Sequence, residues 1–399
     1  MTFAVCFTNF GPYHLTRLRA LAARLSEEGV RLVAYEVAGS ERRYPWSRSQ
    51  NDEPFAWITL FPDRALETLS RSACRRAIAV ALERDRPDAL GIVGYARPES
   101  MAAARWARRQ GRPAILMSES RAIDRPRVWW KELIKKRRLR WFDSALVGGP
   151  AHRDYLADLG MPPDRVALGY NAVDNDYFAK QAQSWRERPQ GRSGLPRAPY
   201  FLTVCRFVPE KNLVRLVEAF ARYRHQSSSS AAWDLVLCGD GPGSGEVAGA
   251  IARSGCAPAI HRPGFLQAGS LPRWYAHAAA FVLPSLSEPW GLVVNEAAAS
   301  GLPLLVSTHA GCALSLVPEP HGTTGSRFDP LDLDAILIKL AWMAALPEES
   351  RRAMGRRAAE VVSHWGPDRF AGGMMEALEL ARTARRRRAK SSMAAVKAR

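Results

Sequence analysis

The amino-acid sequence predicts an α/β fold with two Rossmann-like domains that face each other across a cleft. Strand-like and helix-like patterns alternate along the whole chain, as they do in folds with parallel sheets. A polar stretch rich in proline and glycine, residues 185–199, interrupts this alternation. A second alternating series begins at Tyr200 and continues to about residue 345. Ligands bind such sheets at the carboxyl ends of the strands, so two facing domains would enclose a site.

The first half is expected to contain six strands. The strand at residues 3–8 is followed by leucines at helical spacing, and Gly29 ends that helix. Helical patterns lie between most of the later strands. These later strand candidates cover residues 31–37, 89–93, 114–117, 145–147 and 166–168.

The breaks in the pattern divide the chain into five expected segments. These are a first domain (1–185), a linker (186–199), a second domain (200–366), a final helix (367–384) and a basic tail (385–399). The final helix is separated from the preceding one because Pro367 cannot continue a helix. The tail begins with a run of arginines and is expected to be disordered or peripheral.

The composition favours acidic partners. The chain has 399 residues and a formal net charge of +18, which suits nucleotide diphosphates, anionic membrane surfaces or nucleic acid. Its six cysteines are scattered, without a Cys-x2-Cys pair, and are expected to be free thiols in a reducing compartment. No apolar run is long enough to cross a membrane, and the chain begins directly with a strand. A cytoplasmic protein is therefore expected, either free or peripheral at the inner membrane face.

The most informative segment covers residues 287–303. Glu288 lies just before Gly291, where an apolar helix pattern begins, and Glu296 lies about one turn inside that helix. A helix start offers free N–H groups and a partial positive charge, both of which suit a phosphate. The two carboxylates can then hold hydroxyl groups of the same ligand. A sugar nucleotide has both kinds of group.

This segment resembles the signature of the retaining family-4 glycosyltransferases, in which two glutamates are separated by seven residues. Residues 206–212, 238–242 and 281–285 extend the resemblance, which is strong over about residues 200–330 and looser before them. It implies the GT-B fold, with the donor held mainly by the second domain and the last helix crossing back onto the first. It also implies transfer of a hexose from a nucleotide diphosphate sugar, with no metal or other cofactor. A UDP-sugar is the favoured donor and a GDP-sugar the second candidate.

Two cations are expected to bind the donor diphosphate. Arg206 follows the strand at residues 200–204, and Lys211 lies at the start of the next helix. There they can neutralise the charge that develops on the leaving group as the glycosidic bond breaks. In the family, cations at these positions bind the diphosphate.

The resemblance assigns further donor contacts in the second domain. It implies that Glu288 approaches the donor sugar and that Glu296 binds the ribose hydroxyls. The backbone of Gly291 and Leu292 would contact phosphate or sugar. Phe265 and Leu266 would line the base pocket, with packing in the core as the alternative.

The first domain offers three candidates. The loop after the first strand contains Gly11, expected to let the diphosphate approach, and His14, expected to bind acceptor or donor. A structural histidine at a helix start is the alternative for His14. Many family members carry a histidine after a middle strand of this domain, whereas here Glu119 follows the strand at residues 114–117. Glu119 is therefore a catalytic and acceptor-binding candidate whose role stays open, and a non-catalytic relative is an alternative.

Two short motifs and one basic segment have competing interpretations. Asp174 with Asp176, and Asp332 with Asp334, match the Asp-x-Asp metal motif of the other large glycosyltransferase fold. They are interpreted as a turn before the linker and as a helix cap, so no metal ligand is expected. Residues 125–142 combine tryptophans with lysines and arginines. They suit contact with an anionic membrane, contact with an acceptor, or a helix whose tryptophans lie in the core.

The leading hypothesis is hexosyl transfer to a saccharide or lipid-linked acceptor in polysaccharide or glycolipid biosynthesis. One alternative is another GT-B enzyme, either a nucleotide-sugar epimerase or a sugar-phosphate synthase. Another is a basic nucleic-acid-binding protein without enzymatic activity. Against the latter, the positive charge is spread over many helices and no RNA- or DNA-binding module is recognised, so nucleic acid is not the expected partner.

Overall fold

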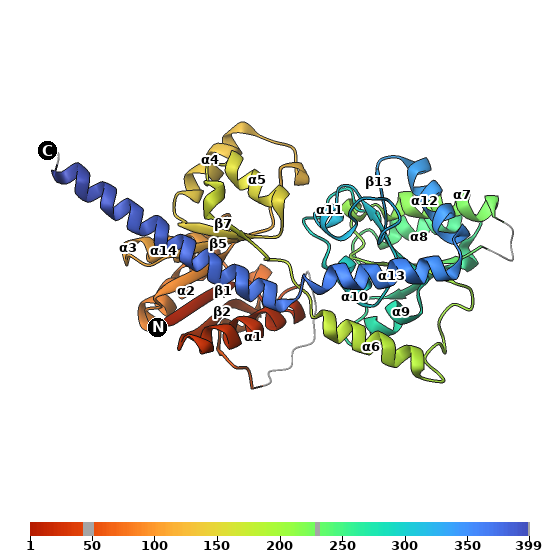
Figure 1. Ribbon diagram of the computed structural model, residues 1–399, viewed down its shortest axis with the longest axis horizontal. Coiled ribbons are helices and arrows are strands. Elements are labelled where there is room, and N and C mark those ends of the chain that lie inside the picture. The colour runs from red at the N-terminus through yellow and green to blue at the C-terminus, as the bar shows by residue number, and fades with distance from the viewer. Residues whose placement is uncertain (43–51, 228–231, 398–399) are drawn as a thin grey trace. The chain divides into compact units, whose positions relative to one another are not determined.

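The computed structural model describes residues 1–42, 52–227 and 232–397. They form two compact units: residues 1–172 with 367–399, and residues 173–366. Each unit contains one parallel sheet with helices on both faces, which confirms the predicted α/β class (Figure 1).

The first unit has a seven-stranded parallel sheet in the order β3-β2-β1-β4-β5-β6-β7. Its strands are β1 (Thr2–Phe7), β2 (Arg31–Ser40), β3 (Ala56–Ala65), β4 (Ala89–Val93), β5 (Ala114–Ser118), β6 (Ser144–Val147) and β7 (Val166–Leu168). The α-helices are α1 (Pro12–Glu27), α2 (Arg71–Asp85), α3 (Pro98–Arg109), α4 (Trp129–Leu139), α5 (Pro150–Asp158) and α14 (Pro367–Lys397). Short 3₁₀ turns are η1 (Leu66–Thr68), η2 (Ala122–Asp124) and η3 (Pro163–Arg165).

Alternating side chains of β1 supply two cores, one on each face of this sheet. Phe3 and Val5 pack with residues of α1 and α14. Ala4 and Cys6 pack with residues of α2, α3 and α5. This alternation follows from the two-residue period of a strand, and apolar residues on both faces mark a fully covered parallel sheet.

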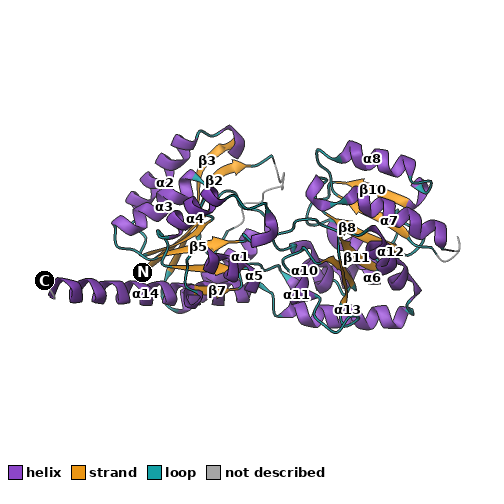
Figure 2. Ribbon diagram, turned by 90° about the horizontal axis from the view of Figure 1, so that it is seen from above, coloured by secondary structure: helices purple, strands orange, loops and turns teal. Residues whose placement is uncertain are grey.

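The second unit has a six-stranded parallel sheet in the order β10-β9-β8-β11-β12-β13. Its strands are β8 (Tyr200–Val204), β9 (Asp234–Cys238), β10 (Ile260–Gly264), β11 (Ala280–Leu283), β12 (Leu304–Ser307) and β13 (Gly325–Phe328). The α-helices are α6 (Asn175–Glu187), α7 (Leu213–Gln226), α8 (Ser244–Arg253), α9 (Leu271–His277), α10 (Leu292–Ala299), α11 (Ala313–Leu316), α12 (Leu333–Ala345) and α13 (Glu348–Ser363). Two 3₁₀ turns are η4 (Pro209–Lys211) and η5 (Ala257–Ala259). Figure 2 shows helices on both faces of each sheet.

All six strands predicted for the first half are present, each within three residues of its expected bounds. β3 is an additional strand that the sequence pattern did not single out. It lies at the edge of the sheet, pairs only with β2 among the described residues, and is half-buried or exposed along its length. Such a strand lacks the continuous apolar run of its buried neighbours.

The boundary between the units differs from the expected linker at residues 186–199. The second unit begins at Val173, so α6 belongs to it. The reason is packing: the Phe178 ring meets the Tyr275 ring of α9 at 5.9 Å between centroids. Arg186 of the same helix donates to the backbone oxygen of Ala276 at 2.9 Å.

The expectation of a disordered or peripheral basic tail is also wrong for its first part. α14 continues as one helix through this region, and its earlier turns pack in the same core as α1. Arg385 and Arg388 donate to the buried carboxylate of Asp143 at 3.3 and 2.8 Å. A buried carboxylate needs such partners, so this pair of arginines holds the helix to the first unit.

Candidate active site

The segment between β11 and α10 brings Glu288 to the carboxyl end of the second sheet. Gly291 precedes α10 with φ of +101°, and a Cβ atom there would lie 3.0 Å from Leu283 and 3.2 Å from Glu288. Left-handed backbone and close packing together require glycine at this position. Leu292 then begins the helix, so the first N–H groups of α10 lie next to the Glu288 loop.

Lys211 and Glu288 are brought together from two separate loops. The Lys211 ammonium group forms an ion pair with the Glu288 carboxylate, and both side chains are largely buried. The backbone N–H of Leu286 donates to the backbone carbonyl oxygen of Glu210 at 2.8 Å, and this hydrogen bond connects the two loops. This places one cation and one carboxylate in the loops that precede α10.

Arg206 lies on the same loop as Lys211, directly after β8, and is half-buried. The loop packs against the turn after β9, where the Phe207 N–H donates to the backbone carbonyl oxygen of Asp240 at 2.9 Å. A Cβ atom at Gly239 would lie 1.8 Å from the Cys205 oxygen, and one at Gly241 would lie 2.5 Å from the Phe207 oxygen. The two glycines therefore shape the Arg206 loop.

Glu296 is almost completely enclosed, with 1% of its surface exposed. The Tyr275 hydroxyl of α9 donates to its Oε2 atom at 2.6 Å. A buried carboxylate is costly without hydrogen-bond donors, so Tyr275 positions Glu296. Sequence analysis missed Tyr275, because no local sequence pattern connects a residue of α9 with a residue of α10. The strand β11 separates the two helices in the chain.

Phe265 and Leu266 follow β10, the edge strand of the sheet. The Gly239 N–H donates to the Gly264 oxygen at 2.8 Å, which links their loop to the turn beneath Arg206. Phe265 is 40% exposed and Leu266 is half-buried. The alternative that Phe265 packs in the core is therefore wrong, and the ring stays accessible at the carboxyl end of the strands.

In the first unit, Gly11 and His14 form the start of α1 after β1. The Gly11 N–H donates to His14 Nδ1 at 3.0 Å. An Nδ1 atom that accepts a hydrogen bond carries no proton, so the proton of the neutral ring lies on Nε2. His14 therefore caps its own helix, which supports the structural alternative without removing Nε2–H as a donor.

Glu119 follows β5 and is half-buried. The pKa of the Tyr170 phenol is raised, mainly by burial and also by the negative charge of Glu119. The positive charge of Arg17 opposes this shift. The Arg17 guanidinium lies 5.0 Å from the centre of the Tyr170 ring and donates to the Ala172 oxygen. Sequence analysis missed Arg17, although its position one turn after His14 in a helix was a usable signal.

Two family models match the chain, one in each half. A "Glycosyl transferase 4-like domain" matches residues 15–172, and "Glycosyl transferases group 1" matches residues 186–361. The chain belongs to the family-4 glycosyltransferases. These matches support a glycosyltransferase over the alternative of a basic nucleic-acid-binding protein without enzymatic activity.

Curated relatives and a solved structure agree with this assignment. A sulfoquinovosyl transferase from Arabidopsis thaliana is 30% identical over 54% of this chain and 39% of the relative. A GDP-mannose-dependent α-(1-6)-phosphatidylinositol monomannoside mannosyltransferase from Mycolicibacterium smegmatis is 28% identical over 50% of each chain. The glycosyltransferase thus spans half or less of the length of these two relatives. Sucrose-phosphate synthase from Thermosynechococcus elongatus superposes with a TM-score of 0.73 at 18% identity, covering 94% of this chain and 97% of that one, which shows the GT-B fold.

The two Asp-x-Asp motifs of this glycosyltransferase are helix caps. Asp174 accepts from the Tyr177 N–H at 2.9 Å at the start of α6. Asp332 accepts from the backbone N–H groups of Asp334 and Ala335 at the start of α12. Within residues 1–42, 52–227 and 232–397, no three His, Cys, Asp or Glu side chains are grouped to hold a metal ion.

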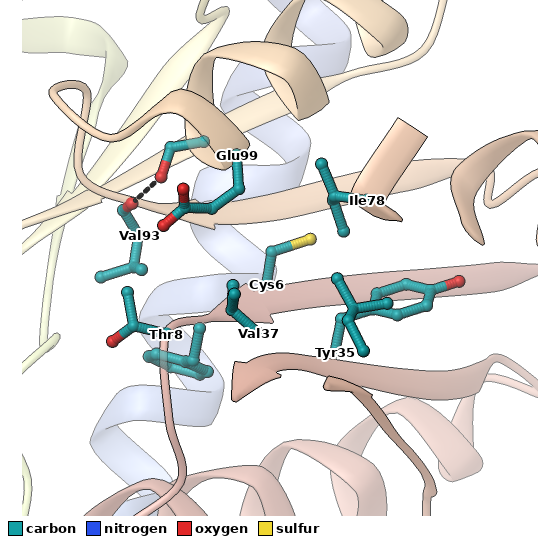
Figure 3. A pocket seen from close by; sticks show the side chains of 10 residues that line it. Cys6, Thr8, Tyr35, Val37, Ile78, Val93 and Glu99 are labelled. Carbon is teal, nitrogen blue, oxygen red and sulfur yellow. Dashed lines mark hydrogen bonds between the residues drawn. The ribbon is translucent and has the colours of Figure 1, made fainter. Parts of the chain in front are cut away.

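A small cavity lies at the carboxyl ends of β1 and β4 in the glycosyltransferase's first unit (Figure 3). Its volume of about 10 Å³ is close to that needed by one water molecule. Glu99 of α3 lines it and is 5% exposed, and its Oε2 atom has no hydrogen-bond partner in the described part of the chain. Sequence analysis missed this carboxylate, because a glutamate in the first turn of a helix is normally a surface residue.

The protonation of His14 predicts how the stability of this glycosyltransferase depends on pH. Burial, and then the charge of Arg17, lower the pKa of His14 from 6.5 to about 3. Between these values the unfolded chain binds a proton that the folded chain does not. The His14 contribution to the free energy of unfolding is therefore complete above about pH 6.5 and is lost as the pH falls toward 3.

The measurement is urea unfolding at neutral and mildly acidic pH for the wild type and His14→Gln. We expect the wild type to lose more stability on acidification than the variant, whose amide can still accept from Gly11. An NMR titration in which the His14 ring protonates near its ordinary pKa of 6.5 would contradict the assignment.

Proposed function

We propose that this glycosyltransferase moves a hexose from a nucleotide diphosphate sugar to an acceptor hydroxyl with retention of the anomeric configuration. The observation that carries the proposal is the ion pair of Lys211 and Glu288 beside the start of α10. Cation, carboxylate and free helix N–H groups are the groups needed to hold a diphosphate and a sugar hydroxyl together.

The chemistry assigns a separate task to each group. The bond between C1 of the sugar and the diphosphate oxygen breaks, and C1 bonds to the acceptor oxygen. Lys211, Arg206 and the start of α10 stabilise the negative charge on the leaving diphosphate. The departing phosphate oxygen takes the acceptor proton on the same face of the sugar.

Glu288 orients the donor sugar in this scheme and is not a covalent nucleophile. Retaining glycosidases place two carboxylates about 5 Å apart to form a glycosyl-enzyme intermediate. Here the partner of Glu288 is the ammonium group of Lys211, which exchanges the carboxylate for phosphate oxygens when the donor binds. Glu296, positioned by Tyr275, is proposed to accept from the ribose hydroxyls.

The base is proposed to lie against Phe265, whose accessible ring offers a stacking surface. A UDP-sugar is the favoured donor and a GDP-sugar is the second candidate, the donor class in the name of the Mycolicibacterium smegmatis relative. The proposed acceptor is a saccharide or a lipid-linked saccharide, bound by the first unit near His14 and Glu119. The protein is also proposed to contact an anionic membrane peripherally, which would give access to a lipid-linked acceptor. The proposed reaction requires no metal.

The test is a thermal-shift screen of UDP-glucose, UDP-N-acetylglucosamine, UDP-galactose and GDP-mannose, each with EDTA present. A ligand that binds only the folded state raises the melting temperature, so at least one of these donors should do so. Phe265→Ala should lose most of the shift, whereas Leu331→Ala, which removes an exposed apolar side chain elsewhere in the same unit, should keep it. No shift with any donor, or a transferred sugar of inverted configuration by NMR, would overturn the proposal.

A further inference from the structure

Helix α4 has its polar and apolar sides reversed relative to an ordinary surface helix. Glu132 and Lys135 face the unit, where the Lys135 ammonium group donates to Glu132 at 2.7 Å. The Tyr155 hydroxyl of α5 donates to the same carboxylate at 2.9 Å. An ionic cluster thus anchors the inner side of α4, together with buried Leu139.

The outer side of α4 carries its large apolar residues. Trp129 is 78% exposed and Leu133, one turn later, is 60% exposed. Trp130 and Ile134 form a second exposed pair at the same spacing. The alternative that the tryptophans of this segment lie in the core is therefore wrong for Trp129 and Trp130, whereas Trp141 does pack against the core. Large apolar side chains clustered on one exposed face indicate a surface that contacts a membrane or another molecule.

Cations flank this apolar face, and carboxylates are held away from it. Lys131, Lys136, Arg137 and Arg140 are exposed. The three carboxylates of residues 121–143 are paired with cations of the unit: Asp124 with Arg121, Glu132 with Lys135, and Asp143 with Arg388. The outer side of α4 therefore combines tryptophan, aliphatic side chains and uncompensated positive charge.

We propose that α4 docks in the plane of an anionic membrane, with Trp129, Trp130 and Leu133 in the interfacial layer and the flanking cations on lipid phosphates. Tryptophan is suited to this layer because its ring is apolar and its N–H is polar. Lysine and arginine stems can lie along the apolar side chains while the charged ends reach the headgroups. A membrane fits better than a protein partner because the face offers area and charge but almost no polar group of defined direction.

The contact is peripheral. Among residues 1–42, 52–227 and 232–397, no helix has the length and apolar character needed to cross a bilayer. The inference deepens the membrane contact of the proposed function by assigning it to α4, and it rests on the surface of that helix whether or not the acceptor is a lipid.

The experiment is sedimentation of the full chain with vesicles of phosphatidylcholine alone or with about one third phosphatidylglycerol. We expect binding to the anionic vesicles to be about tenfold tighter, and to weaken as salt is added. Trp129→Ala/Trp130→Ala should weaken it about fivefold, and Lys131→Gln/Lys136→Gln about tenfold. The matched controls lie on α2 of the same unit: Val80→Ala for exposed apolar surface and Arg75→Gln/Arg76→Gln for exposed charge should change binding less than about twofold.

Circular dichroism and the donor-induced thermal shift should be unchanged in the α4 variants, which separates this test from that of the proposed function. Equal binding of wild type and α4 variants, or equal binding to neutral and anionic vesicles, would overturn the inference. So would a dimer in solution that dissociates in the Trp129→Ala/Trp130→Ala variant, because the face would then be covered by a second copy.

Discussion

Replacing Lys211 with alanine is expected to lower turnover by about a hundredfold, and in any case by more than tenfold. The ammonium group is largely buried and pairs with Glu288 beside the start of α10. A positive charge at such a place stabilises the leaving diphosphate far more than a solvated charge would, because water screens it little. Arg206→Ala should also lower turnover by more than tenfold, because the half-buried Arg206 is proposed to stabilise the same leaving diphosphate.

The measurement is steady-state transfer with the best donor of the screen, with donor binding followed separately. Lys180→Ala is the matched control, because Lys180 is a solvent-exposed lysine of α6 in the same unit and should change turnover little. Lys211→Arg should retain part of the activity, since it keeps the charge but not the compact geometry of an ammonium group. Unchanged turnover in both Lys211→Ala and Arg206→Ala would remove the two cations from the diphosphate site.

The same ion pair makes the effects of two substitutions dependent on each other. Lys211→Ala leaves the Glu288 carboxylate without its paired cation, whereas Glu288→Gln removes the charge that Lys211 compensates. The effects on stability should therefore not add in the double variant, because the two side chains are in direct contact. Additive losses would show that the ion pair does not stabilise the folded chain.

Gly311→Ala is expected to disrupt the Glu288 loop and to cost about 2–3 kcal/mol of stability. A Cβ atom at this position would lie 1.8 Å from the Pro289 oxygen and 3.1 Å from the Trp290 Cα atom. Both neighbours are backbone atoms, so no side-chain rotation relieves the clash. The Gly311 N–H also donates to the backbone carbonyl oxygen of Glu288 at 2.9 Å. A shift of residue 311 therefore displaces the backbone that carries the Glu288 carboxylate.

Urea unfolding and donor binding measure the two consequences of Gly311→Ala. Gly245→Ala is the control, because a Cβ atom in that helix of the same unit meets no atom within 4 Å. It should leave stability unchanged or raise it slightly, as alanine favours a helix over glycine. A Gly311→Ala protein with wild-type stability and donor binding would mean that the loop does not depend on this close approach.

Much of the site was predictable because its residues carry local signals. Arg206 directly follows an apolar strand, and Glu288 lies between such a strand and a helix start. Carboxyl ends of parallel strands meet at one edge of a sheet, so residues at two such ends are neighbours once the strands are correctly assigned. The contact between Lys211 and Glu288 follows from that rule, although the two residues are far apart in the sequence.

The residues that sequence analysis missed have contacts that no local pattern encodes. Tyr275 lies in a short helix with no motif, and its partner Glu296 belongs to a helix that follows the next strand. Glu99 resembles an ordinary surface residue in the first turn of a helix until the neighbouring strands enclose it. Arg388 belongs to a charge run typical of a mobile tail, yet it lies within α14 and donates to the buried carboxylate of Asp143.

The sequence by itself determined the α/β class, the positions of most strands and the loops that carry Arg206, Lys211 and Glu288. Apolar periodicity and turn residues depend on only a few neighbouring positions, so they can be recognised in the sequence alone. Only the tertiary structure decided that α6 belongs to the second unit, that Tyr275 holds Glu296 and that α4 turns its tryptophans outward. Each of these depends on which side of an element is buried, and that is set by the free energy of packing against partners distant in the chain.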